Sequence, residues 1–448
     1  MQPDQSSASA PASGKKQVSR RSILAAVPAA MLMTAAAACG KSSGSSMDSE
    51  ESHSGTVTLT YALWDQEQLP AMKQIIAEFE KTNPKIRVRT AVTPFDSYWT
   101  KLQTAATGGS APDVFWMNLS YFQLYASNEI LLPLTKPIAD AKIDMTQYEP
   151  AITKGYTLGK DVYALPKDID SIGLWYNKKL FAEAGLRVPD ASWKWSDLIA
   201  AAQRLTKGEV HGIAATLSAQ ETYYNTIPQN NGYVISPDGK KSGWDLPATI
   251  EGLQFWTDLI NKYHVSPTLQ QMTDTEPNQM FGAGKVAMYY GGSWESIAFK
   301  RIPYAKENVD VAPLPQGKVA KTVSNGLGNV IYAKTKYPRE AWEFVKFLGS
   351  RRAAEIQGET GTVIPATKGS GTQDAWVKST PEFNLQTFVD EFQYNYAFPV
   401  SVNTAVWSDY ATKTLADAWT AKRPVATVAK DLAKQMNEAL AKEPSRPS

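Results

Sequence analysis

Several short segments of the chain place an aromatic ring beside carboxylate or amide side chains. They are Trp64-Asp65-Gln66-Glu67, Trp116-Met117-Asn118 with Tyr121, Tyr223-Tyr224-Asn225, and Gly292-Ser293-Trp294-Glu295. Aromatic faces pack against apolar C–H surface, and carboxylates and amides pair with hydroxyl groups that are costly to bury unpaired. The combination predicts a site for a polyhydroxylated ligand such as a sugar. We expect contacts from Trp64, Asp65, Glu67, Asn118, Tyr121, Tyr223, Asn225 and Trp294.

Two polar segments add further candidates. Asp168 and Asp170 are two residues apart, and in an extended chain such residues share one face. Paired carboxylates could perform acid–base chemistry on a glycosidic bond, or they could form part of a hinge or bind ligand hydroxyls. Asn325 and Gly326 offer an amide and an accessible backbone, but Ile331 occupies the place of the third glycine of a dinucleotide-binding loop.

Each aromatic or acidic candidate also has a purely structural alternative. Asp65 could cap the helix that follows it. The segment 223–225 could be an ordinary surface loop. Core packing is the alternative for Trp116, and also for two candidates for additional subsites, Trp376 and Trp407.

The surrounding elements alternate between strands and helices. Strands are predicted at 56–61, 86–92 and 112–117, with a helix that carries Met72, Ile75, Ile76 and Phe79 on one face and another at about 96–106. This alternation predicts an α/β domain with a largely parallel sheet, in which ligands bind beyond the carboxyl ends of the strands. Later strands are predicted at 161–166 and 173–176, and helices at 196–206, 247–263, 341–348 and 425–441.

Composition excludes several classes of protein. The 448 residues carry a formal net charge of +2, and the basic excess lies in the first 38 residues, so we expect no nucleic-acid partner. Cys39 is the only cysteine, which excludes an internal disulfide and a cysteine-based metal site. The three histidines, His53, His211 and His264, are isolated in sequence. We expect no metal and no cofactor.

The N-terminal segment resembles an export signal. A basic region ending in Arg20-Arg21 precedes the apolar run 23–38, which is too short to span a bilayer well. The arginine pair resembles a twin-arginine signal, and Ala36-Ala37-Ala38-Cys39 resembles a bacterial lipobox. We predict a signal peptide at 1–38, then lipidated Cys39 and a flexible Ser/Gly tether at 39–55, which would anchor the protein to the outer face of the cell membrane. The alternative is an ordinary cleaved signal beside a chance cysteine.

The body resembles the extracellular solute-binding proteins of bacterial sugar ABC transporters, the maltose-binding-like group or solute-binding family 1. The likeness spans about residues 56–370, and the C-terminal part matches more loosely. The segments that carry it, in order, are 79–88, 109–115, 165–181, 281–294 and 341–348.

The resemblance implies an α/β, two-lobed periplasmic-binding-protein-like fold of type II, with a hinge and a ligand cleft between the lobes. It implies crossings near 167–171, 324–328 and 362–369, with lobe 1 at 56–167 plus 326–366 and lobe 2 at 168–325 plus 367–448. The expected function is capture of a sugar, specifically an oligosaccharide, by lobe closure. A monomer without enzymatic activity would deliver the ligand to membrane permease subunits. The ATPase would be a separate chain, since no phosphate-binding Gly-x-x-x-x-Gly-Lys-Ser/Thr loop occurs.

Three alternatives remain open at this level. Within the binding class, the ligand could be a glycerol phosphate, which would require arginine or lysine in the cleft. A surface lipoprotein enzyme acting on polysaccharide would require a matched pair of carboxyls. An adhesion or sensory lipoprotein would have no role in uptake.

Overall fold

The computed structural model describes residues 55–443. The predicted signal peptide, Cys39 and the tether up to residue 54 lie outside the described residues. Within residues 55–443, no helix combines the length and the apolar character needed to cross a membrane.

Lobe 1 is built on a five-stranded sheet in the order β2-β1-β3-β11-β6. β1 runs parallel to β2 and β3, as predicted, whereas β11 is antiparallel to β3 and β6. The strands are β1 (Val57–Leu63), β2 (Ile86–Val92), β3 (Val114–Met117), β6 (Leu165–Pro166) and β11 (Gly328–Ile331). The helices are α1 (Leu69–Thr82), α2 (Phe95–Thr107), α3 (Leu119–Ser127), α4 (Thr135–Asp140), α5 (Pro150–Gly155), α14 (Pro338–Leu348) and α15 (Arg351–Glu359).

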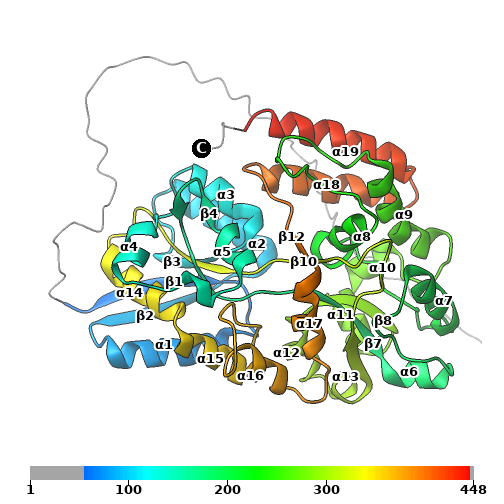
Figure 1. Ribbon diagram of the computed structural model, residues 1–448, viewed down its shortest axis with the longest axis horizontal. Helices are drawn as coiled ribbons and strands as arrows, with labels where there is room; N and C mark the ends of the chain where they lie inside the picture. The colour runs from blue at the N-terminus through cyan, green and yellow to red at the C-terminus, as the bar shows by residue number, and fades with distance from the viewer. Residues whose placement is uncertain (1–54, 444–448) are drawn as a thin grey trace, which may run out of the picture. The chain divides into compact units, whose positions relative to one another are not determined.

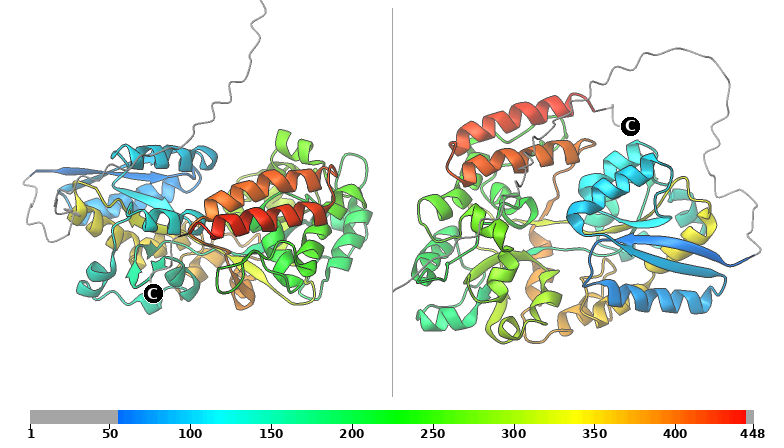
Figure 2. Two further views of the ribbon diagram at one scale, coloured as in Figure 1. Left: turned by 90° about the horizontal axis from the view of Figure 1, so that it is seen from above. Right: turned by 180° about the vertical axis from the view of Figure 1, so that it is seen from behind.

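The apolar periodicity of α1 determines how it packs on this sheet. Met72, Ile75 and Phe79 are buried on one helix face. The ring of Phe344 in α14 lies 5.0 Å from that of Phe79 and 5.1 Å from that of Tyr61 in β1. Figure 2 shows α1 and the sheet as adjacent layers. The predicted helix and the strands around it are confirmed.

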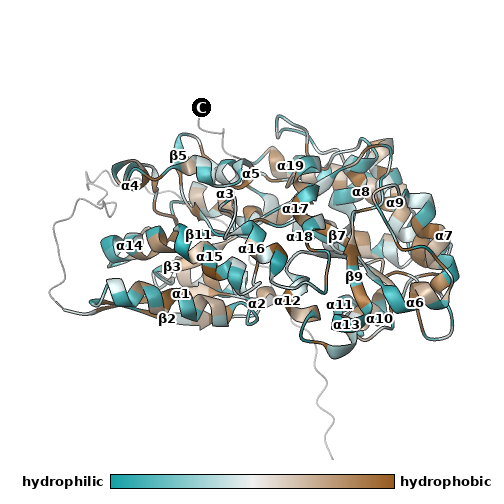
Figure 3. Ribbon diagram, turned by 60° about the horizontal axis from the view of Figure 1, so that its bottom comes forward, coloured by the Kyte–Doolittle hydropathy of each residue, from teal (hydrophilic) through white to brown (hydrophobic). Residues whose placement is uncertain are grey.

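Lobe 2 contains a three-stranded antiparallel sheet in the order β8-β7-β9. Its strands are β7 (Ile172–Asn177), β8 (Met288–Gly292) and β9 (Val309–Ala312). β7 is buried along its whole length, and Figure 3 shows apolar residues gathered around it. The helices before the second crossing are α6 (Lys178–Glu183), α7 (Trp195–Leu205), α8 (Tyr224–Gln229), α9 (Pro247–Asn261), α10 (Leu269–Asp274), α11 (Pro277–Gly282), α12 (Glu295–Phe299) and α13 (Pro303–Asn308).

The C-terminal part adds helices to lobe 2. They are α17 (Gln386–Asp390), α18 (Thr404–Trp419) and α19 (Val425–Leu440), whereas α16 (Gln373–Lys378), which precedes them, packs against α15 of lobe 1 (Figure 1). α18 packs against α19 and α9 and also contacts α3 of lobe 1. Trp376 and Trp407 are buried in the core, at 0% and 3% exposure, so the core-packing alternative holds for both.

Some short pairings are not those expected from the sequence. The strand predicted at 161–166 is divided, because β5 (Asp161–Val162) pairs with β4 (Thr157–Leu158) whereas β6 pairs with β11. β10 (Thr322–Ser324) pairs in parallel with β12 (Asn395–Ala397).

The segments that connect the two sheets lie side by side. Residues 167–171 join β6 to β7, and residues 325–327 join β10 to β11. Isolated bridges pair Asp170 with Asn325 and Asp168 with Pro365, so all three expected crossings meet at one place.

The lobe boundaries themselves are a proposal. Beyond residue 366, Lys368 N still donates to the carbonyl of Gln147 at 3.0 Å. Gln373 Nε2 donates to Glu149 Oε1 at 3.2 Å. We propose that lobe 1 extends past residue 366 to include α16.

Candidate ligand-binding site

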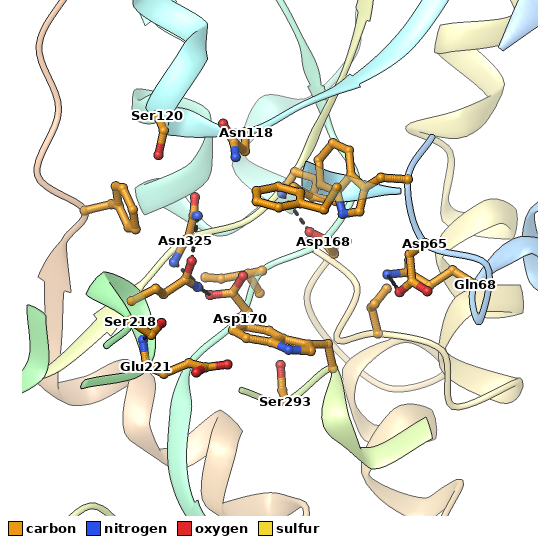
Figure 4. A pocket seen from close by; sticks show the side chains of 18 of the residues that line it. Asp65, Gln68, Asn118, Ser120, Asp168, Asp170, Ser218, Glu221, Ser293 and Asn325 are labelled. Carbon is orange, nitrogen blue, oxygen red and sulfur yellow. Dashed lines mark hydrogen bonds between the residues drawn. The ribbon is translucent and has the colours of Figure 1, made fainter. Parts of the chain in front are cut away.

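A cavity of about 630 Å³ lies where the two lobes and the crossings meet (Figure 4). This volume is typical of small-molecule sites. Lobe 1 contributes Trp64, Asp65, Gln66, Gln68, Phe95, Asn118 and Ser120. The crossings contribute Asp168, Ile169, Asp170, Asn325, Leu327 and Val363. Lobe 2 contributes Ser218, Ala219, Gln220, Glu221, Ser293, Trp294 and Phe398.

Aromatic rings form part of both walls. On the lobe 1 side, the ring of Trp64 lies 5.5, 5.0 and 5.2 Å from those of Phe95, Tyr98 and Trp116 in edge-on contacts. These neighbours fix its orientation, and Phe95 itself is 48% exposed. Trp116 is fully buried, so the core-packing alternative is correct for this residue.

On the lobe 2 side, Trp294 depends on a glycine. A Cβ added at Gly292 would lie 2.1 Å from the Trp294 ring, a distance that no side chain can tolerate. Glycine therefore allows the indole to approach the end of β8 closely.

Asp65 lines the cavity and also closes the turn before α1. Its Oδ1 accepts from Glu67 N at 2.7 Å, and its Oδ2 accepts from Gln68 Nε2 at 2.8 Å. Burial raises the pKa of Asp65, and the hydrogen bond from Gln68 opposes this rise. The alternative of helix capping is wrong for Asp65, because Gln68 holds the N-cap position and no side chain caps α1.

A buried lysine connects this turn to the first crossing. Lys167 is 3% exposed, and its Nζ donates to Gln68 Oε1 at 2.7 Å and to Asp168 Oδ2 at 2.6 Å. The same Nζ lies 4.4 Å from the centre of the Trp116 ring, close enough for a cation–π interaction.

The two aspartates hold the first two crossings together. Asp168 Oδ1 accepts from Leu327 N at 2.7 Å. Asp170 Oδ1 accepts from Asn325 N at 3.0 Å and from Gln220 Nε2 at 2.8 Å. Burial, together with the charge of Asp168, raises the pKa of Asp170 to about 8. These contacts favour a hinge role for the pair over acid–base catalysis.

Asn118 reaches the cavity from the end of β3. It is the N-cap of α3, where its Oδ1 accepts from Tyr121 N at 3.2 Å. This position follows from the strand that the sequence predicts at 112–117, which Asn118 directly follows. The Tyr121 side chain points elsewhere and stacks on Trp99, with ring centroids 3.9 Å apart.

Glu221 is a lining residue that the sequence did not reveal. It lies in a single π-helical turn, η2 (Ala219–Tyr223), and its Oε1 accepts from the Tyr289 hydroxyl at 3.0 Å. Burial raises the pKa of Glu221 to about 7 and that of nearby Glu295 to about 8. No short-range pattern marks such a turn. The only signal available was Glu221's position two residues before Tyr223.

Further lining residues were missed for a simpler reason. They are the small or apolar side chains of the walls and the amides next to predicted residues: Gln68, Ser120, Ile169, Ser218, Gln220, Ser293, Leu327, Val363 and Phe398. Gln68 directly follows the predicted segment 64–67 and Ser293 lies within the predicted segment 292–295, which was the only available signal for them.

The structure does not bring five of the predicted residues into the cavity lining. Tyr223 and Asn225 are 1% and 0% exposed within lobe 2, where Asn225 Oδ1 accepts from Val323 N at 2.9 Å. Tyr223 and Asn225 therefore pack in the core, so they belong neither to the cavity wall nor to a surface loop. Glu67 forms an ion pair with Arg301 of lobe 2. Gly326 packs its backbone against Asp168, and Tyr121 stacks on Trp99 as described.

The predicted residues that do line the cavity come from every predicted segment except 223–225. They are Trp64, Asp65, Asn118, Asp168, Asp170, Trp294 and Asn325. Among the described residues, no group of histidine, cysteine and acidic side chains could hold a metal ion.

Comparison with known proteins decides the family. The model of the family described as bacterial extracellular solute-binding protein matches residues 64–355, well over half of the chain. The chain belongs to this family. Membership indicates an exported protein of a binding class.

The similar proteins resemble this chain in sequence, and the solved ones also resemble it in fold. A solved ABC substrate-binding protein from Listeria monocytogenes, in complex with cycloalternan, is 26% identical with a TM-score of 0.82 and covers 87% of this chain and 100% of its own. A solute-binding protein from Thermotoga lettingae bound with α-D-tagatose is 25% identical, with a TM-score of 0.76 and coverage of 86% and 100%. The galactooligosaccharide-binding protein of Bacillus subtilis is 25% identical over 356 residues, 77% of this chain and 80% of its own length. The predicted two-lobed fold is confirmed.

Proposed function

We propose that this solute-binding protein is the sugar-capturing component of an ABC importer and that its ligand is an oligosaccharide. The observation that carries this proposal is the cavity between the lobes, where Trp64 and Trp294 offer rings from opposite lobes beside carboxyl and amide groups. The printed names of the relatives, which bind galactooligosaccharide or cycloalternan, support the same ligand class.

Capture would occur by lobe closure about the crossings. A ligand that contacts both walls binds the closed state more tightly than the open state, and it shifts the populations by that difference in affinity. The ion pair between Glu67 of lobe 1 and Arg301 of lobe 2 would add a direct link in the closed state.

The remaining parts of the proposal concern location and partners. The protein would be anchored through lipidated Cys39 to the outer face of the membrane, as a monomer without enzymatic activity. It would pass its ligand to permease subunits that are driven by a separate ATPase.

The charge of the cavity argues against the glycerol phosphate alternative. Its ionisable lining residues are all acidic, and no lysine or arginine lies among the described lining residues. An anionic ligand would meet like charge in a partly dehydrated site, which weakens binding.

A thermal-shift screen of the purified protein against oligosaccharides tests this function. Ligand at about 100 times its Kd should stabilise the protein by about 2.7 kcal/mol, and the sugar should be recovered unchanged. Trp294→Ala should weaken binding by about tenfold through loss of its ring contact. Trp195→Ala is the matched control, because Trp195 is a partly buried tryptophan of lobe 2 outside the cavity lining. The absence of any stabilisation, or conversion of a sugar to products, would contradict the proposal.

A further inference from the structure

Only some of the carboxyls that line the cavity have a basic side chain beside them. Lys167 pairs with Asp168 and is hydrogen-bonded to Gln68, the partner of Asp65. Asp170 and Glu221, in contrast, form no ion pair among the described residues. Their hydrogen-bond partners are amide donors for Asp170 and the hydroxyls of Tyr289 and Ser218 for Glu221.

Among the described residues, no cation pairs with either of these two carboxyls, because Lys167 of the first crossing is paired with Asp168. The other charged or titratable groups around them are Asp168, Tyr156, Glu276, Tyr289 and Glu295. Glu295 itself contacts Asn278 amide nitrogen at 3.3 and 3.4 Å and has no basic partner among the described residues. This side of the cavity therefore carries acidic groups without a counter-charge.

A second observation is an acceptor on this wall that has no hydrogen-bond partner. Asn325 is 5% exposed and lines the cavity, but its Oδ1 has no hydrogen-bond partner. Asp170 Oδ2 likewise accepts none of the hydrogen bonds among the described residues. Figure 4 shows Asn325, Asp170 and Glu221 along one wall of the cavity.

A ligand group that carries both hydrogen-bond donors and positive charge would complement this wall of the cavity. A sugar hydroxyl supplies a single donor and adds acceptor lone pairs to a wall already rich in acceptors. An ammonium group supplies three donors and no acceptor, and its charge pairs with a carboxylate.

We propose that the ligand is an amino-bearing, cationic oligosaccharide whose ammonium group binds against Asp170 and Glu221. This inference rests on the proposed sugar-binding function and specifies the ligand class for the same cavity.

The proposal has a consequence for protons. In the empty cavity, burial raises the pKa of Asp170 to about 8 and that of Glu221 to about 7, so both are substantially protonated at neutral pH. A bound ammonium favours their ionised forms and lowers both pKa values. Binding of the amine should therefore release protons at pH 7, and a neutral oligosaccharide should not cause this release.

Titration calorimetry on the full chain tests the proposal with sugar pairs that differ only by an amino group in place of a hydroxyl. Suitable pairs are the glucosamine trisaccharide against cellotriose, and 6-amino-6-deoxymaltotriose against maltotriose. In the pair whose glycosidic linkage fits the cavity, the amino sugar should bind at least about tenfold more tightly than the neutral sugar. The binding heat, measured in two buffers of different ionisation enthalpy, should report the release of protons. Equal or tighter binding of the neutral member would overturn this inference alone. Failure of every sugar to bind would overturn the sugar-binding function with it.

Variants test which carboxyls are responsible. Glu221→Gln and Asp170→Asn keep the shape of the side chain and remove its charge, so each should reduce the preference for the amine by about tenfold. The control is Glu209→Gln, because the Glu209 side chain is 85% exposed, pairs with Lys285 and is not among the lining residues. Persistence of the full preference in Glu221→Gln would refute the assignment even if Asp170→Asn fails to fold.

Discussion

Replacement of Lys167 by methionine removes the only cation in the network beneath the cavity. Its Nζ contacts Gln68 Oε1 and Asp168 Oδ2, and the side chains of Lys167 and Asp168 are only 2% and 6% exposed. Since solvent screening is small at this depth, loss of one partner leaves Asp168 as an uncompensated buried charge. Removal of one member of such a pair typically costs about 3–5 kcal/mol. Methionine fills a similar volume, so a cavity adds little to this cost.

Denaturant unfolding at pH 7 measures the effect. We expect Lys167→Met to lower the free energy of unfolding by about 3 kcal/mol or more. The double variant Lys167→Met with Asp168→Asn should recover part of that loss, because the stranded charge is gone. Lys413→Met is the control, since its pair with Asp409 is 73% and 61% exposed and should contribute at most about 1 kcal/mol.

Two results would refute this reasoning. The first is a loss for Lys167→Met no larger than that of the surface control. The second is a double variant that is no more stable than the single one, which would mean that the unpaired carboxyl of Asp168 is not the source of the loss.

Two further predictions concern pH and the aromatic wall. Burial raises the pKa of Asp170 and Glu295 to about 8 and that of Glu221 to about 7, so the folded protein holds protons that the unfolded chain has already released. The free energy of unfolding of the empty protein should therefore fall as pH rises from 5 to 8, and a flat or rising profile in denaturant titrations would contradict the shifts. Gly292→Ala should displace the Trp294 ring and weaken oligosaccharide binding with little change in the rest of lobe 2, and unchanged affinity in calorimetry would show that the ring is not held there.

The sequence was most informative where one periodicity governs a segment. The alternation of strands and helices from residue 56 to 117 was predictable because one apolar face of each element packs on one sheet. Trp64 and Asn118 could be placed at the site because side chains after the carboxyl ends of parallel strands converge at one edge.

Prediction was weakest where side-chain direction depends on tertiary contacts. Tyr223 and Asn225 are two and four residues from the lining residue Glu221, but the π-helical turn directs Glu221 to the cavity and Tyr223 to the core. The sequence contains no signal for that turn. The contact between Lys167 and Gln68 joins residues 99 positions apart, so only the fold reveals it.

The paired crossings have a mechanical consequence. Because Asp170 pairs with Asn325 and Asp168 with Pro365, the strands between the lobes form a narrow ribbon and not independent tethers. A hydrogen-bonded ribbon bends and twists readily about its own length but resists sliding of one strand past another. Relative motion of the lobes should thus follow nearly a single rotational path, so that every turnover returns the molecule to the same geometry.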